Sequence, residues 1–208
     1  MRTLTEEKRQ AIIDAATQLF QETGYERASM SEVAKRVGGS KATLYNYFES
    51  KEELFETIVR TYSTRFLTEA AAELDTPEAG PLSLEEKLTR FGEKMMLVLT
   101  GGNPALQIYR IVVGEAGHSD IGELFQGSGT KESMTRLADL MADAMQKGEL
   151  TQADPTLRAK QFTALVKAEA DAMLLQREPP DCSPAQVREM VRNGVALFLH
   201  GASFQKGQ

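Results

Sequence analysis

Apolar side chains recur along most of this chain at spacings of three and four residues, the period of an α-helix with one buried face. No stretch of useful length alternates apolar and polar residues as a half-buried β-strand would. The pattern therefore predicts an all-α fold. The expected N-terminal helices cover residues 6–23, 29–37, 40–47 and 50–74, and the last would be about 35 Å long. Five more helices are expected over 83–100, 103–117, 129–147, 154–177 and 184–204.

Helix ends carry their own signals. Gly24 follows the first helix as a C-terminal cap. Serines precede the next three helices, where a hydroxyl can accept a hydrogen bond from the first turn. Two of these serines have a glutamate three residues later, the capping-box pattern, and one stands alone: Ser29 with Glu32, Ser50 with Glu53, and Ser40. The later helices are separated by TGGNP, GHSD, GSG, KGELTQADP and EPPDCSP.

The composition changes after DTPEAGPL, residues 75–82, and we place a domain boundary there. The predicted organisation is a DNA-binding domain over 1–55, a connecting part of the long helix over 56–74, and a larger helical domain over 75–208.

Hydrophobic residues make up 41% of the chain and charged residues 26%, as in folded globular proteins. No run approaches the roughly 18 apolar residues of a membrane span, and the first ten residues lack the apolar core of a signal peptide. Cys182 is the only cysteine, so no intrachain disulfide can form. We expect a cytoplasmic protein with no membrane association.

The formal net charge is −6, which by itself disfavours nucleic-acid binding. The segment from Arg27 to Lys51, however, contains five basic and two acidic residues, a local net charge of +3. A basic segment on an acidic chain suits a protein that binds DNA tightly only at a preferred site, because the sequence-independent attraction to phosphates stays small.

Helices 29–37 and 40–47 are joined by a short glycine-containing turn, which predicts a helix-turn-helix motif. Their buried side would be Val33, Val37, Leu44 and Phe48, and the outward side of the second helix would be Lys41, Ala42, Thr43, Tyr45 and Asn46. Lysine can donate to guanine acceptors, small apolar groups can touch a thymine methyl, and tyrosine offers a ring and a hydroxyl. Ser29, Tyr47 and Lys51 are placed to bind phosphates.

Residues 8–55 resemble the N-terminal domain of the TetR/AcrR family of bacterial transcriptional regulators. The matching pieces are IIDAATQLFQETGYERASMSEVAKRVG, SKATLYNYF and SKEELF. The resemblance implies that Ser29 and Ser31 approach DNA, and that Tyr47 and Lys51 hold phosphates. It also implies that Lys41, Ala42, Thr43 and Tyr45 face base edges or nearby backbone. The family usually has an apolar residue where this chain has Gly39, a departure expected to cost about 1 kcal/mol in packing and flexibility.

Residues 75–208 resemble one of the family's helical ligand-binding and dimerisation domains, through RIVVGEAGHSDIGELF and ADAMQKGEL. Methionines and aromatics at helical spacing could line a pliable apolar pocket with a few polar groups. The candidate pocket residues are Met95, Met96, Leu99, Tyr109, Arg110, His118, Phe125, Met141, Met145, Phe162 and Glu169. Ordinary core packing is the alternative for each of them.

Helices 154–177 and 184–204 carry apolar stripes. Family members commonly dimerise through such a pair of helices, although the same stripes would also suit packing within one subunit. A homodimer would present two reading helices to half-sites about 34–36 Å apart, and hence to a palindromic operator.

The function predicted from these features is a ligand-responsive DNA-binding regulator, a repressor released from operator DNA by a small apolar or amphipathic effector. The alternatives are a helical adaptor, or an enzyme with a site near Glu115 and His118 and no role on DNA. We expect no enzymatic activity, because EAGHSD reads more naturally as a helix end. With two histidines and no HExxH or CxxC, neither a metal site nor another cofactor is expected.

Overall fold

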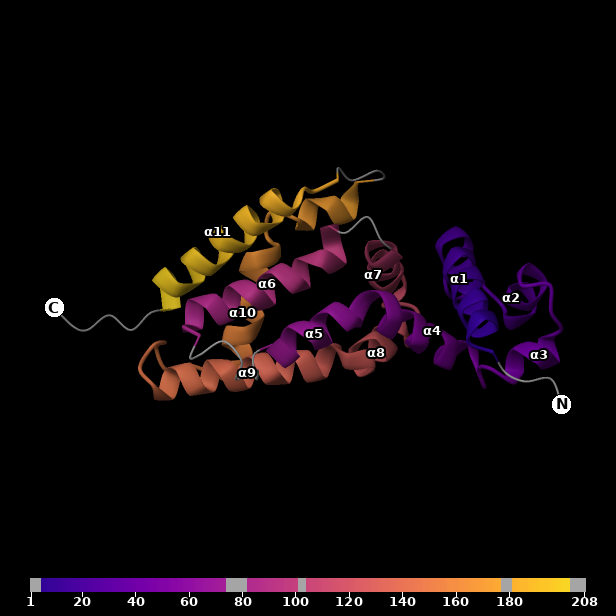
Figure 1. Cartoon of the computed structure of the whole chain (residues 1–208), viewed down its shortest axis with the longest axis horizontal. Coiled ribbons are helices and arrows are strands. Elements are labelled where there is room, and N and C mark those ends of the chain that lie inside the picture. The colour runs from indigo at the N-terminus through magenta and orange to yellow at the C-terminus, as the bar shows by residue number, and fades with distance from the viewer. Residues whose placement is uncertain (1–4, 74–81, 101–103, 177–180, 203–208) are drawn as a thin grey trace. The chain divides into compact units, whose positions relative to one another are not determined.

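The protein is described by a computed structural model over residues 5–73, 82–100, 104–176 and 181–202. Within these ranges the chain is predominantly helical and forms no β-strand, which confirms the all-α prediction (Figure 1). The α-helices are α1 (Glu6–Thr23), α2 (Met30–Arg36), α3 (Lys41–Tyr45), α4 (Lys51–Val59), α5 (Arg65–Glu73), α6 (Leu84–Thr100), α7 (Pro104–Glu115), α8 (Ile121–Phe125), α9 (Lys131–Gln146), α10 (Pro155–Lys167) and α11 (Pro184–Ala202). The predicted ends at 74, 103 and 203–204 lie outside the described residues.

The described chain forms two compact units. The first contains residues 5–64 together with 104–128, and the second contains 65–73 and 82–100 together with 129–176 and 181–202. Helices α7 and α8 therefore pack with the N-terminal helices, although they come from the part of the sequence that we assigned to the larger domain. The functional division into 1–55, 56–74 and 75–208 remains a prediction.

The first unit is built around an aromatic cluster of Phe20, Tyr25 and Phe55. The ring centroids of Tyr25 and Phe55 are 5.0 Å apart, and those of Phe20 and Phe55 are 5.9 Å apart with the rings edge to face. All three side chains are at most 4% exposed. Because aromatic side chains bury large areas, this cluster joins α1, α4 and the residues that follow α1 into one core.

The predicted helix 50–74 is helical as far as its described residues go, but it is not a uniform α-helix. A π-helical segment, η1 (Arg60–Thr64), separates α4 from α5. In this segment the Tyr62 hydroxyl donates to Asp14 Oδ1 at 2.5 Å, and the Thr64 hydroxyl donates to the Ser128 carbonyl at 2.6 Å. Burial and the hydrogen bond to Asp14 raise the pKa of Tyr62 to about 12.

A second π-helical segment, η3 (Gln126–Thr130), joins α8 to α9. The α-helix ends at Phe125, just before the predicted GSG stop, but the chain stays helical through GSG until α9 begins at Lys131. The Ser128 hydroxyl donates to the Leu124 carbonyl at 2.6 Å, the bond to the carbonyl four residues back that a serine side chain can make within a helix.

The second unit is formed by α5, α6, α9, α10 and α11 (Figure 1). These helices bury a core that includes Phe91, Phe162 and Phe198. The Phe162 and Phe198 ring centroids are 5.4 Å apart. Gly194 of α11 lies so close to α10 that an added Cβ would be 2.8 Å from the Val166 Cα. The absence of a side chain at this position lets the two helices approach.

The helix predicted over 154–177 is shorter than expected. It ends at Lys167 and is followed by a turn and a 3₁₀-helix, η4 (Asp171–Leu175). Backbone bonds from Ala168 to Leu165 and from Ala170 to Lys167 tighten the chain at this point. No glycine or proline marks the break in the sequence, so periodicity alone extended the helix through it.

Candidate nucleic-acid interface

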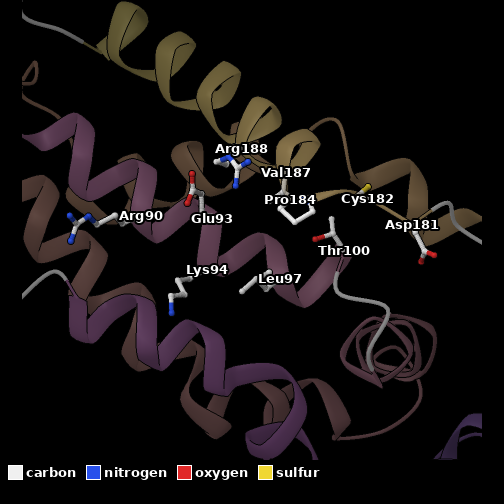
Figure 2. A pocket seen from close by; sticks show the side chains of 10 residues that line it. All are labelled: Arg90, Glu93, Lys94, Leu97, Thr100, Asp181, Cys182, Pro184, Val187 and Arg188. Atoms are coloured by element: carbon white, nitrogen blue, oxygen red, sulfur yellow. The ribbon is translucent and has the colours of Figure 1, made fainter.

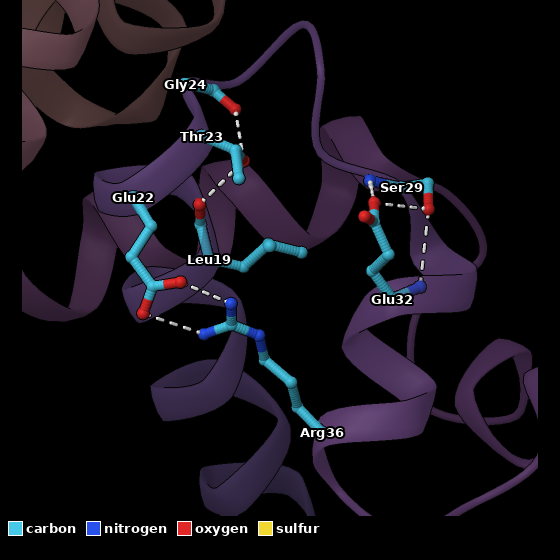
Figure 3. Close-up of polar contacts among 7 residues, drawn as sticks. All are labelled: Leu19, Glu22, Thr23, Gly24, Ser29, Glu32 and Arg36. Atoms are coloured by element: carbon cyan, nitrogen blue, oxygen red, sulfur yellow. Dashed lines mark hydrogen bonds and ion pairs between the residues drawn. The ribbon is translucent and has the colours of Figure 1, made fainter.

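The predicted turn between α2 and α3 forms as expected. Ser29 and Glu32 make the reciprocal capping box: the Ser29 hydroxyl accepts from the Glu32 N–H at 3.3 Å, and the Glu32 carboxylate accepts from the Ser29 N–H at 3.1 Å (Figure 3). Gly38 has a φ of 66°, a left-handed conformation that glycine adopts without strain. The Ser40 hydroxyl then caps α3 by accepting from the Thr43 N–H at 3.1 Å.

One side of helix α3 is buried against the first unit, and its opposite side is exposed to solvent. Leu44 and Phe48 are 2% and 1% exposed, as predicted for the buried side. Four residues predicted to face outward are exposed, namely Lys41, Ala42, Tyr45 and Asn46. Thr43 is half-buried, and its hydroxyl lies 2.9 Å from that of Ser40.

Tyr45 is 42% exposed and lies beside Lys41, whose Nζ is 5.7 Å from the centre of the tyrosine ring. The exposed edge of α3 thus offers an ammonium group, a phenol, an amide and a methyl group on one short segment. These are groups that contact base edges in a major groove.

Ser29 and Tyr47 were predicted to bind phosphates and Ser31 to approach DNA, and the three differ in how many hydrogen bonds they make within the chain. Ser29 is exposed, but its hydroxyl donates to Glu32 at 2.8 Å. Ser31 is half-buried at the start of α2. The Tyr47 hydroxyl accepts from the Thr5 N–H at 3.1 Å, which leaves its own hydrogen available to a phosphate.

Lys51 points into the protein. Its Nζ donates to the Tyr25 carbonyl at 3.1 Å, lies within 3.5 Å of the carbonyls of Glu26 and Ala28, and stands 4.2 Å from the centre of the Tyr25 ring. A phosphate contact by Lys51 would have to compete with these bonds. The second predicted capping box is also only half formed, because Glu53 accepts from the Glu49 N–H and not from that of Ser50.

The basic segment is less available than its charge count suggested. Arg36 forms a two-pronged ion pair with Glu22 that ties α2 to α1 (Figure 3), and its guanidinium lowers the pKa of that carboxyl. Arg27 donates to the Thr23 carbonyl at 2.7 Å. Lys35 and Lys41 are exposed, and neither makes a hydrogen bond or ion pair within the described residues.

The α1–α2 loop, which we define as residues 24–28, is held by a residue whose role sequence reasoning missed. The Glu115 carboxylate accepts from the Tyr25 N–H at 2.7 Å and from the Glu26 N–H at 3.0 Å. Glu115 closes α7, 90 residues from Tyr25 in the chain, and no local pattern connects the two. Its neighbour His118 is exposed, and the Ser119 hydroxyl accepts from the Ile121 N–H at 3.4 Å at the start of α8.

The departure from the family pattern at Gly39 leaves no hole in the core. Gly39 is exposed, and a Cβ added there would meet no atom within 4 Å. A Cβ at this position would therefore make no packing contact, and the backbone flexibility of glycine is the remaining cost.

The candidate pocket residues are divided between the two units. Met95, Met96, Met141, Met145 and Phe162 are buried core residues of the second unit. The Glu169 carboxylate, in the same unit, accepts from Asn193 at 3.0 Å. Tyr109, Arg110, His118 and Phe125 belong to the first unit, where the Tyr109 and Phe125 rings are 5.7 Å apart. The side chain of Leu99 lies outside the described residues.

A groove of about 460 Å³ does open in the second unit between α6 and the start of α11 (Figure 2). Leu97, Pro184 and Val187 supply its apolar surface, and Figure 2 shows charged side chains around them. The complete lining is Arg90, Glu93, Lys94, Leu97, Thr100, Asp181, Cys182, Pro184, Val187 and Arg188. Burial, with Asp181 nearby, raises the pKa of the Cys182 thiol, so this cysteine is a poor nucleophile at neutral pH.

The apolar stripes of the two C-terminal helices pack largely within the subunit. Phe162, Val166, Val191, Val195 and Phe198 are all at most 3% exposed. One leucine on each helix remains outside this core: Leu157 of α10 is 50% exposed and Leu197 of α11 is 60% exposed.

Among the described residues, no group of three or more histidine, cysteine, aspartate or glutamate side chains is arranged to hold a metal ion. Of the helices in the described ranges, none combines the length and the apolar composition that a bilayer crossing requires.

Two family models match the chain. The model described as "Bacterial regulatory proteins, tetR family" matches residues 12–58, and the model described as "AefR-like transcriptional repressor, C-terminal domain" matches residues 86–201. Together they cover the helix-turn-helix motif and most of the helices C-terminal to it.

Two similar solved structures cover nearly the whole chain, and a third relative covers about three quarters of it. A TetR family transcriptional regulator from Pseudomonas syringae pv. tomato is 28% identical with a TM-score of 0.71, covering 97% of this chain and 100% of its own. The flavonoid-responsive regulator FrrA is 29% identical with a TM-score of 0.68, at 96% and 98% coverage. The fatty acid metabolism regulator protein of Bacillus subtilis is 24% identical over 154 residues, which are 73% of this chain and 75% of the relative.

Proposed function

Because this chain belongs to the TetR family of bacterial transcriptional regulators, we propose that it is a repressor released from a palindromic operator by a small apolar or amphipathic effector. The observation that carries the DNA-binding part is the exposure of Lys41, Ala42, Tyr45 and Asn46 on a helix anchored by Leu44 and Phe48. A rigidly seated helix with a polar outer edge is what major-groove reading requires.

The effector site proposed here is the groove between α6 and α11 in Figure 2. Its volume of about 460 Å³ is in the range of small-molecule sites, and it combines apolar surface with charged groups. Three of those groups are cationic, Arg90, Lys94 and Arg188, against the two acids Glu93 and Asp181, so an amphipathic molecule with an acidic end is the ligand class that it suits best. One similar protein is named a fatty acid metabolism regulator, and a fatty acid has an apolar chain and an acidic end. Another is named a flavonoid-responsive regulator, and a flavonoid is a small aromatic molecule with polar hydroxyl groups.

The dimer is proposed to form through α10 and α11. Their inner faces are occupied by core packing, so the contact would use the outer faces, where Leu157 and Leu197 are exposed. A two-fold dimer would give each half of the operator its own copy of α3.

The function is tested by fluorescence anisotropy with a duplex selected from a random-sequence pool by the wild-type protein, with salt varied. Lys41→Ala should weaken binding about tenfold, and it should lower the salt slope by about one if its ammonium neutralises a phosphate. Tyr45→Ala should weaken binding to the selected duplex more than to an unrelated one. Lys131→Ala, an exposed lysine at the start of α9 and away from the proposed dimer contact, is the control for charge loss. Wild-type affinity in both α3 variants would remove α3 from the interface.

The effector site is tested separately. Leu97 lines the groove and is 37% exposed, so Leu97→Trp can fill the groove without entering the core. It should abolish release by a long-chain acyl carboxylate or a flavonoid while leaving DNA affinity unchanged. Release of Leu97→Trp at the same concentration as wild type would place the effector elsewhere.

The enzyme alternative near Glu115 and His118 is disfavoured by the position of the carboxylate. Both Glu115 oxygens accept backbone hydrogen bonds from the α1–α2 loop, whereas a general base must face its substrate. The family that contains this chain consists of DNA-binding regulators.

A further inference from the structure

We propose that Glu115 is a positioning residue for DNA binding, which holds the α1–α2 loop and thereby fixes α2 against the reading helix α3. The proposal rests on the DNA-binding function above. A residue at the end of α7, far from the helix-turn-helix motif in sequence, would thus help to hold the motif in its DNA-binding geometry.

The Glu115 carboxylate uses both of its oxygens to bind the α1–α2 loop. One carboxylate oxygen accepts from Tyr25 at 2.7 Å and the other from Glu26 at 3.0 Å, so both oxygens are used on successive N–H groups. Hydrogen bonds to an ionised acceptor are about twice as strong as neutral ones. Gly24 makes room for the carboxylate, because a Cβ at this position would lie 2.3 Å from Glu115 Oε1.

The same loop is held from its other side by the opposite charge. Glu115 takes the N–H groups of the loop, while the Lys51 ammonium faces the carbonyls of Tyr25, Glu26 and Ala28. The peptide groups of this short connection are therefore oriented by an anion from α7 and a cation from α4. A loop fixed in this way has little freedom to vary the direction in which the chain enters α2.

The placement of the loop matters for DNA because the loop leads directly into the motif. Ala28 immediately precedes Ser29, the cap of α2, and α2 packs against α3. Releasing the loop would let α2 shift and would tilt the exposed edge of α3. Because major-groove contacts require the reading helix at a fixed angle, such a tilt would cost specific contacts before it cost general attraction to phosphates.

The test compares Glu115→Gln with Glu123→Gln, a matched loss of one carboxylate from an exposed residue on the neighbouring helix α8. Glutamine keeps the size of the side chain but turns one acceptor into a donor, which opposes an N–H of the loop. We expect Glu115→Gln to bind the selected duplex about tenfold more weakly and an unrelated duplex less than twofold more weakly. Glu123→Gln should bind both as wild type does or slightly better.

Two further measurements separate positioning from stability. The backbone amides of Tyr25 and Glu26 should exchange with deuterium faster in Glu115→Gln, while amides in the second unit keep their rates. If Glu115→Gln lost the same factor on both duplexes, the residue would act only through the amount of folded protein, and the proposal would be wrong. Wild-type affinity for the selected duplex would also overturn it, and failure of the wild type to bind any duplex would remove the proposed function with it.

Discussion

Gly194 of α11 lies directly against the backbone of α10 at Leu165 and Val166. Replacing a helical glycine by alanine normally stabilises a helix by about 1 kcal/mol. At Gly194 the new Cβ would lie 2.8 Å from Val166 Cα, 2.9 Å from Val166 N and 3.1 Å from Leu165 C, all backbone atoms of α10. These atoms have no rotamer to change, so α10 and α11 would have to separate by roughly half an ångström, enough to forfeit a quarter or more of each close contact.

Overpacking of this kind costs about 1–3 kcal/mol, and a clash with backbone belongs at the upper end. After subtraction of the helix-propensity gain, Gly194→Ala should lower the free energy of unfolding by about 2 kcal/mol. Gly201→Ala, in the same helix with nothing within 4 Å of the added methyl, should raise it by about 0.5–1 kcal/mol. Gly92→Ala should fall between them, because its closest neighbour is a Val191 methyl that can move.

The assay is urea unfolding followed by far-ultraviolet circular dichroism at one fixed protein concentration, since a dimer's stability depends on concentration. The midpoints should rank Gly201→Ala above wild type, then Gly92→Ala, then Gly194→Ala, with a similar dependence on urea. An unchanged or raised midpoint for Gly194→Ala would show that α10 and α11 are not in close backbone contact, and the reasoning would fail.

Three other predictions concern single side chains. The free energy of unfolding of Tyr62→Phe should fall less than that of wild type as the pH rises from 10 to 12. The folded-state pKa of Tyr62 is raised to about 12, so the stability that this shift provides is complete below pH 10 and is lost as the pH rises through 12. Alkaline unfolding curves that run parallel for the two proteins would contradict this. Lys51→Met should lower the free energy of unfolding by about 1–2 kcal/mol, against less than about 0.5 kcal/mol for Lys35→Met; loss of DNA binding at full stability would instead support a phosphate contact by Lys51. Leu197→Glu should shift the protein toward monomer in light scattering, whereas Val113→Glu, equally exposed on α7, should not; an intact Leu197→Glu dimer would place the interface elsewhere.

The local features of the motif could be predicted because their causes are local. Ser29 and Glu32 are three residues apart, and that spacing alone brings both into the first turn of α2. The alternation that buried Leu44 and exposed Tyr45 likewise depends on one helical turn. Ser40 also caps α3 as predicted, because its hydroxyl lies beside the N–H groups of the first turn.

Features that depend on distant segments could not be predicted. Lys51 was predicted to bind phosphate because lysine side chains usually reach solvent. The fold instead directs its ammonium to carbonyl oxygens of the α1–α2 loop. Glu115 meets Tyr25 across 90 residues. The methionines that suggested a pocket are buried in the core of the second unit, since helical spacing is the same for a core and for a cavity.

The π-helical segment between α4 and α5 has a consequence for how this chain can be edited. A π turn bonds each N–H to the carbonyl five residues back, one more than an α turn, and so stores a surplus residue between Arg60 and Thr64. Removing one residue there would let an ordinary α-helix close while α4 and α5 each keep their buried faces. Elsewhere in either helix the same deletion would rotate every later side chain by about 100°.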